Sequence, residues 1–294
     1  MALVAYKPNK HKLFARKSTV EKVVYGVVFV IFTLYAATLL FPLVWGLISS
    51  LKTPFEYYEP FSLPAKPLFS NYLNAIDSLG MENMSMLEML WNSIWFSVGS
   101  TIITVLCTSI TAYVMSKYRF RGRRFVYSLF IIVLVFPIYG SFPAQYRLMY
   151  NLHVVDSYLI LFTAIGAISF NLLIMMSFYD SLSWSYAESA MIDGAGPLKI
   201  YHRVMLPQAT SMVLAIFLMV FIGNWNNYLS PILYLPSRLT LSAGLFMFQE
   251  VVTRQGNYPE YFAASFMLIL PVFILYCFLA NTIMTNLSIG GLKG

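Results

Sequence analysis

Residues 183–207 read SWSYAESAMIDGAGPLKIYHRVMLP and lie between two long apolar runs. Ser185 and the glutamate three residues later have the form of a capping box, which satisfies free backbone groups at a helix start. Gly194 stands where that short helix would close, because glycine takes the left-handed C-cap conformation without penalty. Pro197 suits the first turn of a second helix, and Pro207 would stop or kink that helix. The segment therefore predicts two short helices joined by a glycine turn, projecting from between two membrane segments as a docking element.

The rest of the chain is dominated by apolar runs. With 59% hydrophobic and 11% charged residues in 294, the composition is too apolar for an ordinary soluble domain. The first run is longer than the roughly 7–15-residue core of a signal peptide, so we expect an uncleaved span. Spanning a bilayer takes about 20 apolar residues. We predict an all-α membrane protein with six spans, near residues 23–51, 90–116, 125–145, 157–179, 209–235 and 261–287.

The distribution of basic residues predicts the orientation of these spans. With the N-terminal tail 1–22 in the cytoplasm, that side carries 14 Lys and Arg residues and the opposite side carries five. Basic residues are enriched in cytoplasmic loops, so both termini and residues 183–207 are expected to face the cytoplasm. The same residues would meet anionic lipid headgroups, which we prefer to nucleic acid as the reason for the net charge of +7. The predicted location is a cell membrane, crossed several times.

The inventory of chemical groups excludes several functions. No Asp, Glu, Lys, Arg or His falls within the six predicted spans, whereas carriers driven by protons or sodium usually place an ionisable residue in the bilayer. No phosphate-binding loop of the form Gly-x-x-x-x-Gly-Lys-Ser/Thr occurs, so transport driven by ATP would need a separate ATPase. The three histidines lie in separate segments and predict no metal site. No catalytic residue is assigned.

The segment 183–207 also carries a family resemblance. Glu188-Ser189-Ala190, then Gly194 four positions after Ala190, and Leu206-Pro207 after a further Val204 resemble the EAA loop of ABC importer permeases. Ser189 replaces an alanine and Val204 replaces an isoleucine of that pattern. The stretch 192–195, Trp225-Asn226 and the terminal residues 290–294 are similar to the smaller permease of maltose-type carbohydrate importers. We call residues 183–207 the coupling loop.

The resemblance implies a function and a set of partners. The chain would be a non-catalytic permease subunit that moves a sugar by alternating access. A second related permease, two ATPase subunits that use ATP and Mg, and an extracytoplasmic sugar-binding protein would complete the importer, and the chain itself would hold no cofactor. The ATPase would contact two segments of this chain, the coupling loop and the C-terminal tail 288–294. The contacting residues would be Glu188, Ser189, Ala190, Asp193, Gly194, Leu206 and Pro207 in the loop, and Leu292, Lys293 and Gly294 in the tail.

The fifth predicted span contains a polar cluster that allows two interpretations. Its members are Asn224, Trp225, Asn226 and Asn227. Amides buried in hydrocarbon must find partners, so the cluster could line a sugar path or join helices to one another. For the whole chain, the alternatives are a stand-alone secondary carrier or channel for a neutral polar solute, or a membrane anchor for a soluble enzyme. The carrier or channel does not explain the paired helices predicted for the coupling loop.

Overall fold

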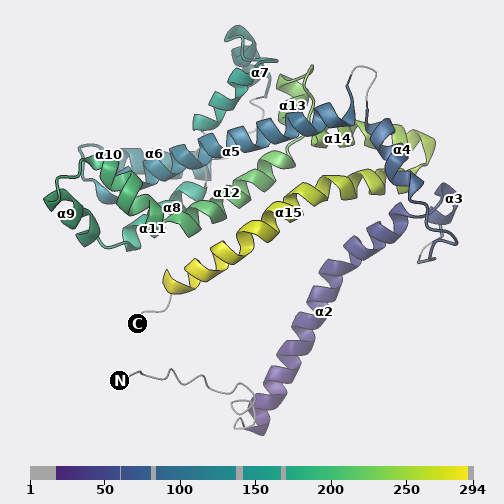
Figure 1. Ribbon diagram of the computed structural model, residues 1–294, viewed down its shortest axis with the longest axis horizontal. Helices are drawn as coiled ribbons and strands as arrows, with labels where there is room; N and C mark the ends of the chain where they lie inside the picture. Colours follow the sequence, from purple (N-terminus) through teal and green to yellow (C-terminus); the bar gives the residue numbers. More distant parts are fainter. Residues whose placement is uncertain (1–17, 60, 81–83, 137–141, 167–169, 291–294) are drawn as a thin grey trace.

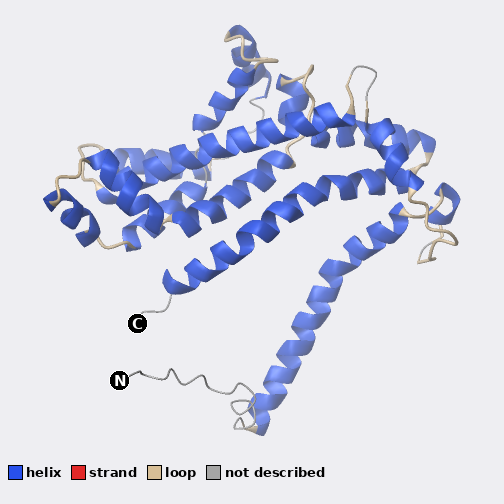
Figure 2. Ribbon diagram, in the orientation of Figure 1, coloured by secondary structure: helices blue, strands red, loops and turns tan. Residues whose placement is uncertain are grey.

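The computed structural model describes residues 18–59, 61–80, 84–136, 142–166 and 170–290, with the side chains of 282 and 284–290 excepted. Every regular element in these ranges is a helix (Figures 1 and 2). In chain order they are α2 (Thr19–Ser50), α3 (Pro54–Tyr57), α4 (Ser70–Leu79), α5 (Met86–Lys117), α6 (Arg123–Val135), α7 (Phe142–Asn151), the 3₁₀ helix η1 (Tyr158–Gly166), α8 (Phe170–Ser181), α9 (Ser185–Ile192), α10 (Pro197–Ile200), the π-helical turn η2 (Tyr201–Met205), α11 (Leu206–Gln208), α12 (Thr210–Trp225), α13 (Leu229–Tyr234), α14 (Leu241–Gln255) and α15 (Tyr258–Gly290).

Helix α5 lies at the centre of the bundle. It packs against α8, α12, η1 and α14, and α12 in turn packs against α15 (Figure 1). The buried polar residues of α5 are small and recur at spacings of three or four, so that they share one face of the helix: Ser93, Ser97, Ser100, Thr104 and Thr108. Small side chains allow helix backbones to approach closely, which is how helices associate when lipid offers no hydrophobic advantage. This stripe explains how α5 can pack closely against several helices at once.

Helix α2 makes few contacts within the chain. Only Gly46, Ser49 and Ser50 near its end are buried, where the ring of Trp45 meets that of Phe262 at 5.2 Å between centroids. Figure 1 shows the rest of α2 diverging from the bundle, and its apolar side chains are exposed. The helix begins with a complete capping box at Ser18. A helix that is apolar all round is stable only when lipid or another protein covers it.

Three helices are long and apolar enough to cross a membrane: α2, α5 and α15 over Tyr258–Asn281. Two further candidates are bent pairs, η1 with α8 at 55° and Pro197–Gln208 with α12 at 78°. The described residues therefore provide up to five spans. The predicted first, second and sixth spans coincide with α2, α5 and α15, and the fourth and fifth are present as bent or broken helices.

The predicted third span over 125–145 falls partly on residues 137–141, outside the described ranges, and stays a prediction. Helix α6 has 13 residues, and at about 1.5 Å per residue it reaches only about 20 Å, short of the roughly 30 Å hydrocarbon core. It ends at Val135, just before Pro137, and residues 137–141 lie outside the described ranges. Helix α7 begins again at Phe142. A residue that precedes proline is disfavoured in the helical region, which is a local reason for α6 to stop where it does.

The segment between α2 and α5 folds into two short helices, and α4 packs on α15. Glu56 closes the turn around α3: its carboxylate accepts the amide hydrogens of Thr53 at 2.9 Å and Ala65 at 3.1 Å. These two backbone hydrogen bonds, that of Thr53 first, lower the pKa of the Glu56 carboxyl below its ordinary value. The segment is therefore an ordered cap on the end of the bundle opposite the coupling loop (Figure 1).

Candidate coupling surface and polar cluster

Helix α9 closes through Gly194, as predicted. Gly194 has φ of +77°, its amide donates to the carbonyl of Met191 at 3.0 Å, and the amide of Ala195 donates to that of Ala190 at 2.9 Å. These two bonds form a Schellman motif, which satisfies the last free carbonyls of a helix. Because no atom lies within 4 Å of the position that a Cβ would occupy on Gly194, the requirement for glycine is a matter of backbone conformation alone.

The predicted capping box at the start of α9 is wrong. Trp184 occupies the N-cap position and makes no side-chain cap hydrogen bond, while Ser185 is already the first helical residue. The local hydrogen bonds shift by two positions: the Ser183 hydroxyl accepts the amide hydrogen of Ser185 at 3.3 Å and contacts its hydroxyl at 2.8 Å. The physical reason is packing, because the indole of Trp184 meets the ring of Tyr118 at 6.0 Å between centroids and so fixes where the helix begins. Glu188 is thereby left exposed.

The second half of the coupling loop follows the predicted pattern. Pro197 is in the first turn of α10, after Gly196 at the N-cap with φ −74° and ψ 165°. The chain continues through η2 into α11, which contains Pro207, and then bends by 78° into α12. Proline lacks the amide hydrogen that would continue the helical ladder, which accounts for a break at this point. The break turns α10 and α9 away from the direction of the membrane-embedded α12.

A buried aromatic cluster fixes the base of the coupling loop. The hydroxyl of Tyr201 donates to Ser109 Oγ at 2.9 Å, and Ser109 Oγ lies 2.9 Å from the hydroxyl of Tyr179. The ring of Tyr113 meets those of Tyr179 and Tyr201 at 5.6 and 5.1 Å. Ala187, Ile200 and Met205 are also buried against this cluster. No local sequence pattern predicts this anchor, because its members lie far apart along the chain, in α5, α8 and η2.

The tip of the coupling loop presents exposed apolar side chains. Ile192 is 87% exposed and Leu198 is 84% exposed, on either side of the glycine turn. Ser189 and Asp193 are exposed beside them, Ala190 and Leu206 are half-buried, and Pro207 is exposed. Figure 1 shows α9 and α10 at one end of the bundle. The sequence pattern assigned no ATPase-contacting role to Ile192 or Leu198; the available signal was an apolar residue on each side of a predicted turn. The predicted tail contacts Leu292, Lys293 and Gly294 lie outside the described residues.

The structure separates the four members of the polar cluster. Trp225 is 2% exposed, packs on Phe221 and donates from Nε1 to the carbonyl of Leu268 at 3.1 Å. Asn224 donates to Thr101 Oγ1 at 3.1 Å and so joins α12 to α5. These two residues make the helix-to-helix contacts that were the alternative to a sugar path. Asn227 Nδ2 donates to Ser230 Oγ at 2.9 Å within its own turn, and Asn226 is exposed.

The polar cluster therefore does not present four side chains to one surface. A substrate that approached α12 in this structure would meet Asn226, and it would not meet the indole of Trp225. The indole of Trp225 occupies a packing position in this structure, because its ring lies in the core between α12 and α15, while the sugar path stays a prediction. Among the described residues, no group of three His, Cys, Asp or Glu side chains could hold a metal ion.

The comparison with protein families agrees with these features. Residues 105–288, from the middle of α5 to near the end of α15, match the model of the binding-protein-dependent transport system inner membrane component. The chain belongs to this family. It is thus an inner membrane component of an ABC-type import system, as the EAA resemblance implied.

Individual relatives are similar over most of their length. The chain is 29% identical over 262 residues to the diacetylchitobiose uptake system permease protein NgcG of Streptomyces coelicolor, covering 87% of this chain and 85% of the relative. It is 28% identical over 263 residues to the galactooligosaccharides transport system permease protein GanQ of Bacillus subtilis, covering 88% and 92%. The maltodextrin transport system permease protein MdxG of Bacillus subtilis is 31% identical over 209 residues, covering 69% and 74%.

A solved structure shares the fold. It is the crystal structure of a bacterial ABC transporter involved in the import of the acidic polysaccharide alginate, and one of its chains matches with a TM-score of 0.70 at 22% identity. The match covers 90% of this chain and 98% of that chain. The arrangement of helices described above is therefore shared with a chain of that transporter.

Proposed function

We propose that this chain is the permease subunit that moves a sugar or oligosaccharide across the cytoplasmic membrane in an ATP-driven, binding-protein-dependent importer. The relatives named above are called permeases for diacetylchitobiose, galactooligosaccharides and maltodextrin, which are all short carbohydrates. The transport is by alternating access, in which the spans rearrange as fairly rigid bodies around the substrate. The chain performs no catalysis of its own.

One observation supports the proposed coupling to an ATPase: the coupling loop has an exposed apolar tip, and its other end is packed against the bundle. Ile192 and Leu198 are almost fully exposed, whereas the aromatic cluster around Tyr201 holds the other end of the coupling loop to α5 and α8. An exposed apolar patch rimmed by polar residues marks a surface that another protein covers. Motion of a partner at the tip would be transmitted to α5, α8 and α12 through the buried base.

The partners and topology follow from this role. Two ATPase subunits, which use ATP and Mg, bind at the coupling loop, and the C-terminal residues 292–294 reach toward them. A second related permease forms a heterodimer with this chain, and an extracytoplasmic sugar-binding protein delivers the substrate. The protein crosses the membrane six times, with both termini in the cytoplasm. Membrane-facing α2 is covered by lipid or by the second permease.

The test is the affinity of the ATPase for variants of the tip. Burial of a leucine side chain contributes about 1.5–3 kcal/mol, so Leu198→Ser should weaken ATPase binding by roughly 10- to 150-fold. The matched control is Phe55→Ser, an equally apolar change at a residue that is 89% exposed on α3, at the opposite end of the bundle. Binding is measured by titrating purified ATPase onto the permease pair in nanodiscs, with permease abundance as the loading control.

The two variants test the docking role of the coupling loop, and an uptake assay separates the importer from a stand-alone carrier. Normal ATPase binding by Leu198→Ser, or an equal loss in Phe55→Ser, would remove the coupling loop as the docking element. Uptake of a labelled oligosaccharide into vesicles that hold this chain without any ATPase would instead support the stand-alone carrier. Uptake that requires both ATP and the binding protein supports the importer.

A further inference from the structure

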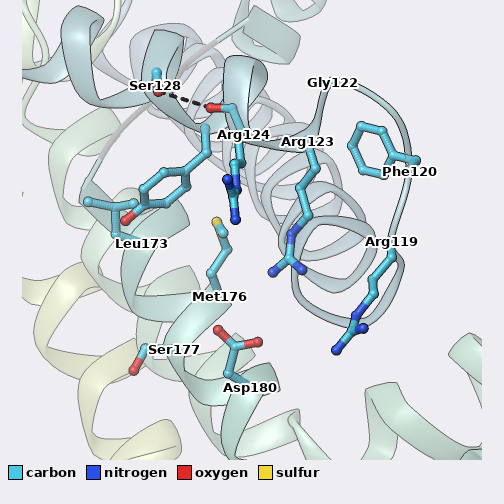
Figure 3. A pocket seen from close by; sticks show the side chains of 11 residues that line it. Arg119, Phe120, Gly122, Arg123, Arg124, Ser128, Leu173, Met176, Ser177 and Asp180 are labelled. Atoms are coloured by element: carbon cyan, nitrogen blue, oxygen red, sulfur yellow. Dashed lines mark hydrogen bonds between the residues drawn. The ribbon is translucent and has the colours of Figure 1, made fainter.

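A cavity that is separate from the coupling loop lies beside the start of α6. Its volume is about 1020 Å³, and it is open on one side and lined by the loop after α5, the start of α6 and one face of α8. Three arginines line it: Arg119, Arg123 and Arg124. Figure 3 shows their guanidinium groups on the same side, toward Met176 and Asp180 of α8.

These three guanidinium groups have no anionic partner among the described residues. The salt bridge found there is Arg254–Glu250, far away in α14, and no hydrogen bond joins the three side chains to a described residue. The carboxylate of Asp180 faces the cavity and accepts a hydrogen bond from Ser116 Oγ at 2.5 Å. Three positive charges and one negative charge leave the cavity with an excess of two positive charges. Such a surplus in a concave site attracts an anion.

Part of the remaining lining is apolar, which distinguishes among anions. Phe120, Leu173 and Met176 lie in the wall beside the polar groups of Tyr127, Ser128 and Ser177, and a soluble phosphate would gain nothing from the three apolar side chains. A neighbouring face of α6, which does not itself line the cavity, exposes apolar side chains at helical spacing: Phe125 is 67% exposed, Leu129 42% and Ile132 49%. An amphiphile with a phosphate at one end and a hydrocarbon chain at the other matches both parts. A guanidinium group pairs with phosphate through two parallel hydrogen bonds.

We propose that this cavity binds the headgroup of one anionic glycerophospholipid. The phosphate lies among Arg119, Arg123 and Arg124, and the acyl chains run along the exposed apolar face of α6. This goes beyond the general attraction of basic loops for membranes, because it assigns a single site with a defined lining. The lipid would join α6 to α8, which packs directly against α5 at the base of the coupling loop.

The test compares two arginines of the same loop. Arg124 lines the cavity, whereas Arg121 is exposed three residues earlier and does not. One basic residue near an anionic membrane surface is worth about 1 kcal/mol, so Arg124→Gln should weaken lipid binding about fivefold. Arg121→Gln changes the net charge equally and should leave binding unchanged. The assay is native mass spectrometry of the assembled transporter, titrated with phosphatidylglycerol and with phosphatidylcholine of identical acyl chains.

A third variant moves the affinity in the opposite direction. Asp180→Asn removes the negative charge from the cavity but keeps an acceptor for Ser116, so it should bind phosphatidylglycerol more tightly than the wild type. This outcome keeps the test decisive if Arg124→Gln is poorly inserted. Glycerol 1-phosphate, which has the phosphate without the acyl chains, should not displace the lipid at equal concentration.

Five results would overturn the proposal. The first four are equal binding of the two lipids by the wild type, equal loss in Arg124→Gln and Arg121→Gln, unchanged binding in Asp180→Asn, and displacement of the lipid by glycerol 1-phosphate. The fourth would assign the cavity to a free phosphate. Loss of ATPase binding in Arg124→Gln with unchanged lipid binding would make the cavity a protein-docking surface and would also refute the lipid site.

Discussion

Gly194→Val isolates the effect of the turn in the coupling loop. Gly194 has φ of +77°, a conformation in which a β-branched residue is a rare outlier. No atom lies within 4 Å of the added Cβ position, so the cost is backbone strain and not a clash. Strain of this kind costs about 1–3 kcal/mol. Because the apolar spans are untouched, the cost falls on the turn that orients Ile192 and Leu198.

The expected result is ATPase binding that is roughly 5- to 150-fold weaker, which is the same range of free energy expressed as an equilibrium constant. Two controls accompany this variant. Gly196→Thr adds a side chain of the same shape two residues later, at φ −74°, where threonine is a favoured N-cap and should have little effect. Gly194→Asn should retain most of the binding, since asparagine tolerates the left-handed conformation.

The assay is the same titration in nanodiscs, with insertion and abundance compared first. Sugar-stimulated ATP hydrolysis is then measured at saturating ATPase, to separate docking from transmission. If Gly194→Val binds and couples as well as the wild type at equal abundance, the left-handed turn does not orient the coupling surface. If Gly196→Thr is as damaging as Gly194→Val, any side chain in this loop interferes and the argument from backbone strain fails.

Three further predictions concern other parts of the chain. Trp225→Ala should destabilise the permease by about 3–5 kcal/mol, seen as a lower thermal midpoint and a lower abundance, because it leaves a cavity in the core. Asn226→Ala should change the stability by no more than about 0.5 kcal/mol while oligosaccharide uptake falls. Equal stability of the two variants would contradict the buried position of Trp225 and the exposed position of Asn226. In a variant whose two native cysteines are replaced by serine, cysteine at Phe55 should react with an impermeant thiol reagent in intact cells or spheroplasts and cysteine at Arg121 should not, whereas the reverse pattern would invert the topology. Glu56→Gln should speed amide hydrogen exchange around α3 at neutral pH. Because the fold lowers the pKa of the Glu56 carboxyl, its contribution to the stability of this turn is present above the ordinary glutamate pKa and disappears as the pH falls through the lowered pKa. Unchanged exchange in the variant would rule out this role.

The sequence by itself determined the features that depend on neighbouring residues. The glycine turn at Gly194 and the helix start at Pro197 follow from backbone preferences that any context would respect, and both are confirmed. The long apolar runs at α2, α5 and α15 follow from length and hydropathy. The spacing of the EAA residues was specific enough to indicate the family, which the match over residues 105–288 confirms.

Only the tertiary structure decided which faces of the helices meet protein. Trp225 and Asn226 are adjacent in an apolar run, yet one is buried in the core and the other is exposed. Lipid is as apolar as a protein core, so a span that is apolar all round carries no periodic signal for its buried side. The start of α9 illustrates the same limit, since the packing of Trp184 against Tyr118 displaced a capping box that the local pattern favoured. The anchor at Tyr201 and the arginine cavity likewise join residues from separate helices, and their assembly depends on the packing of α5 against α8.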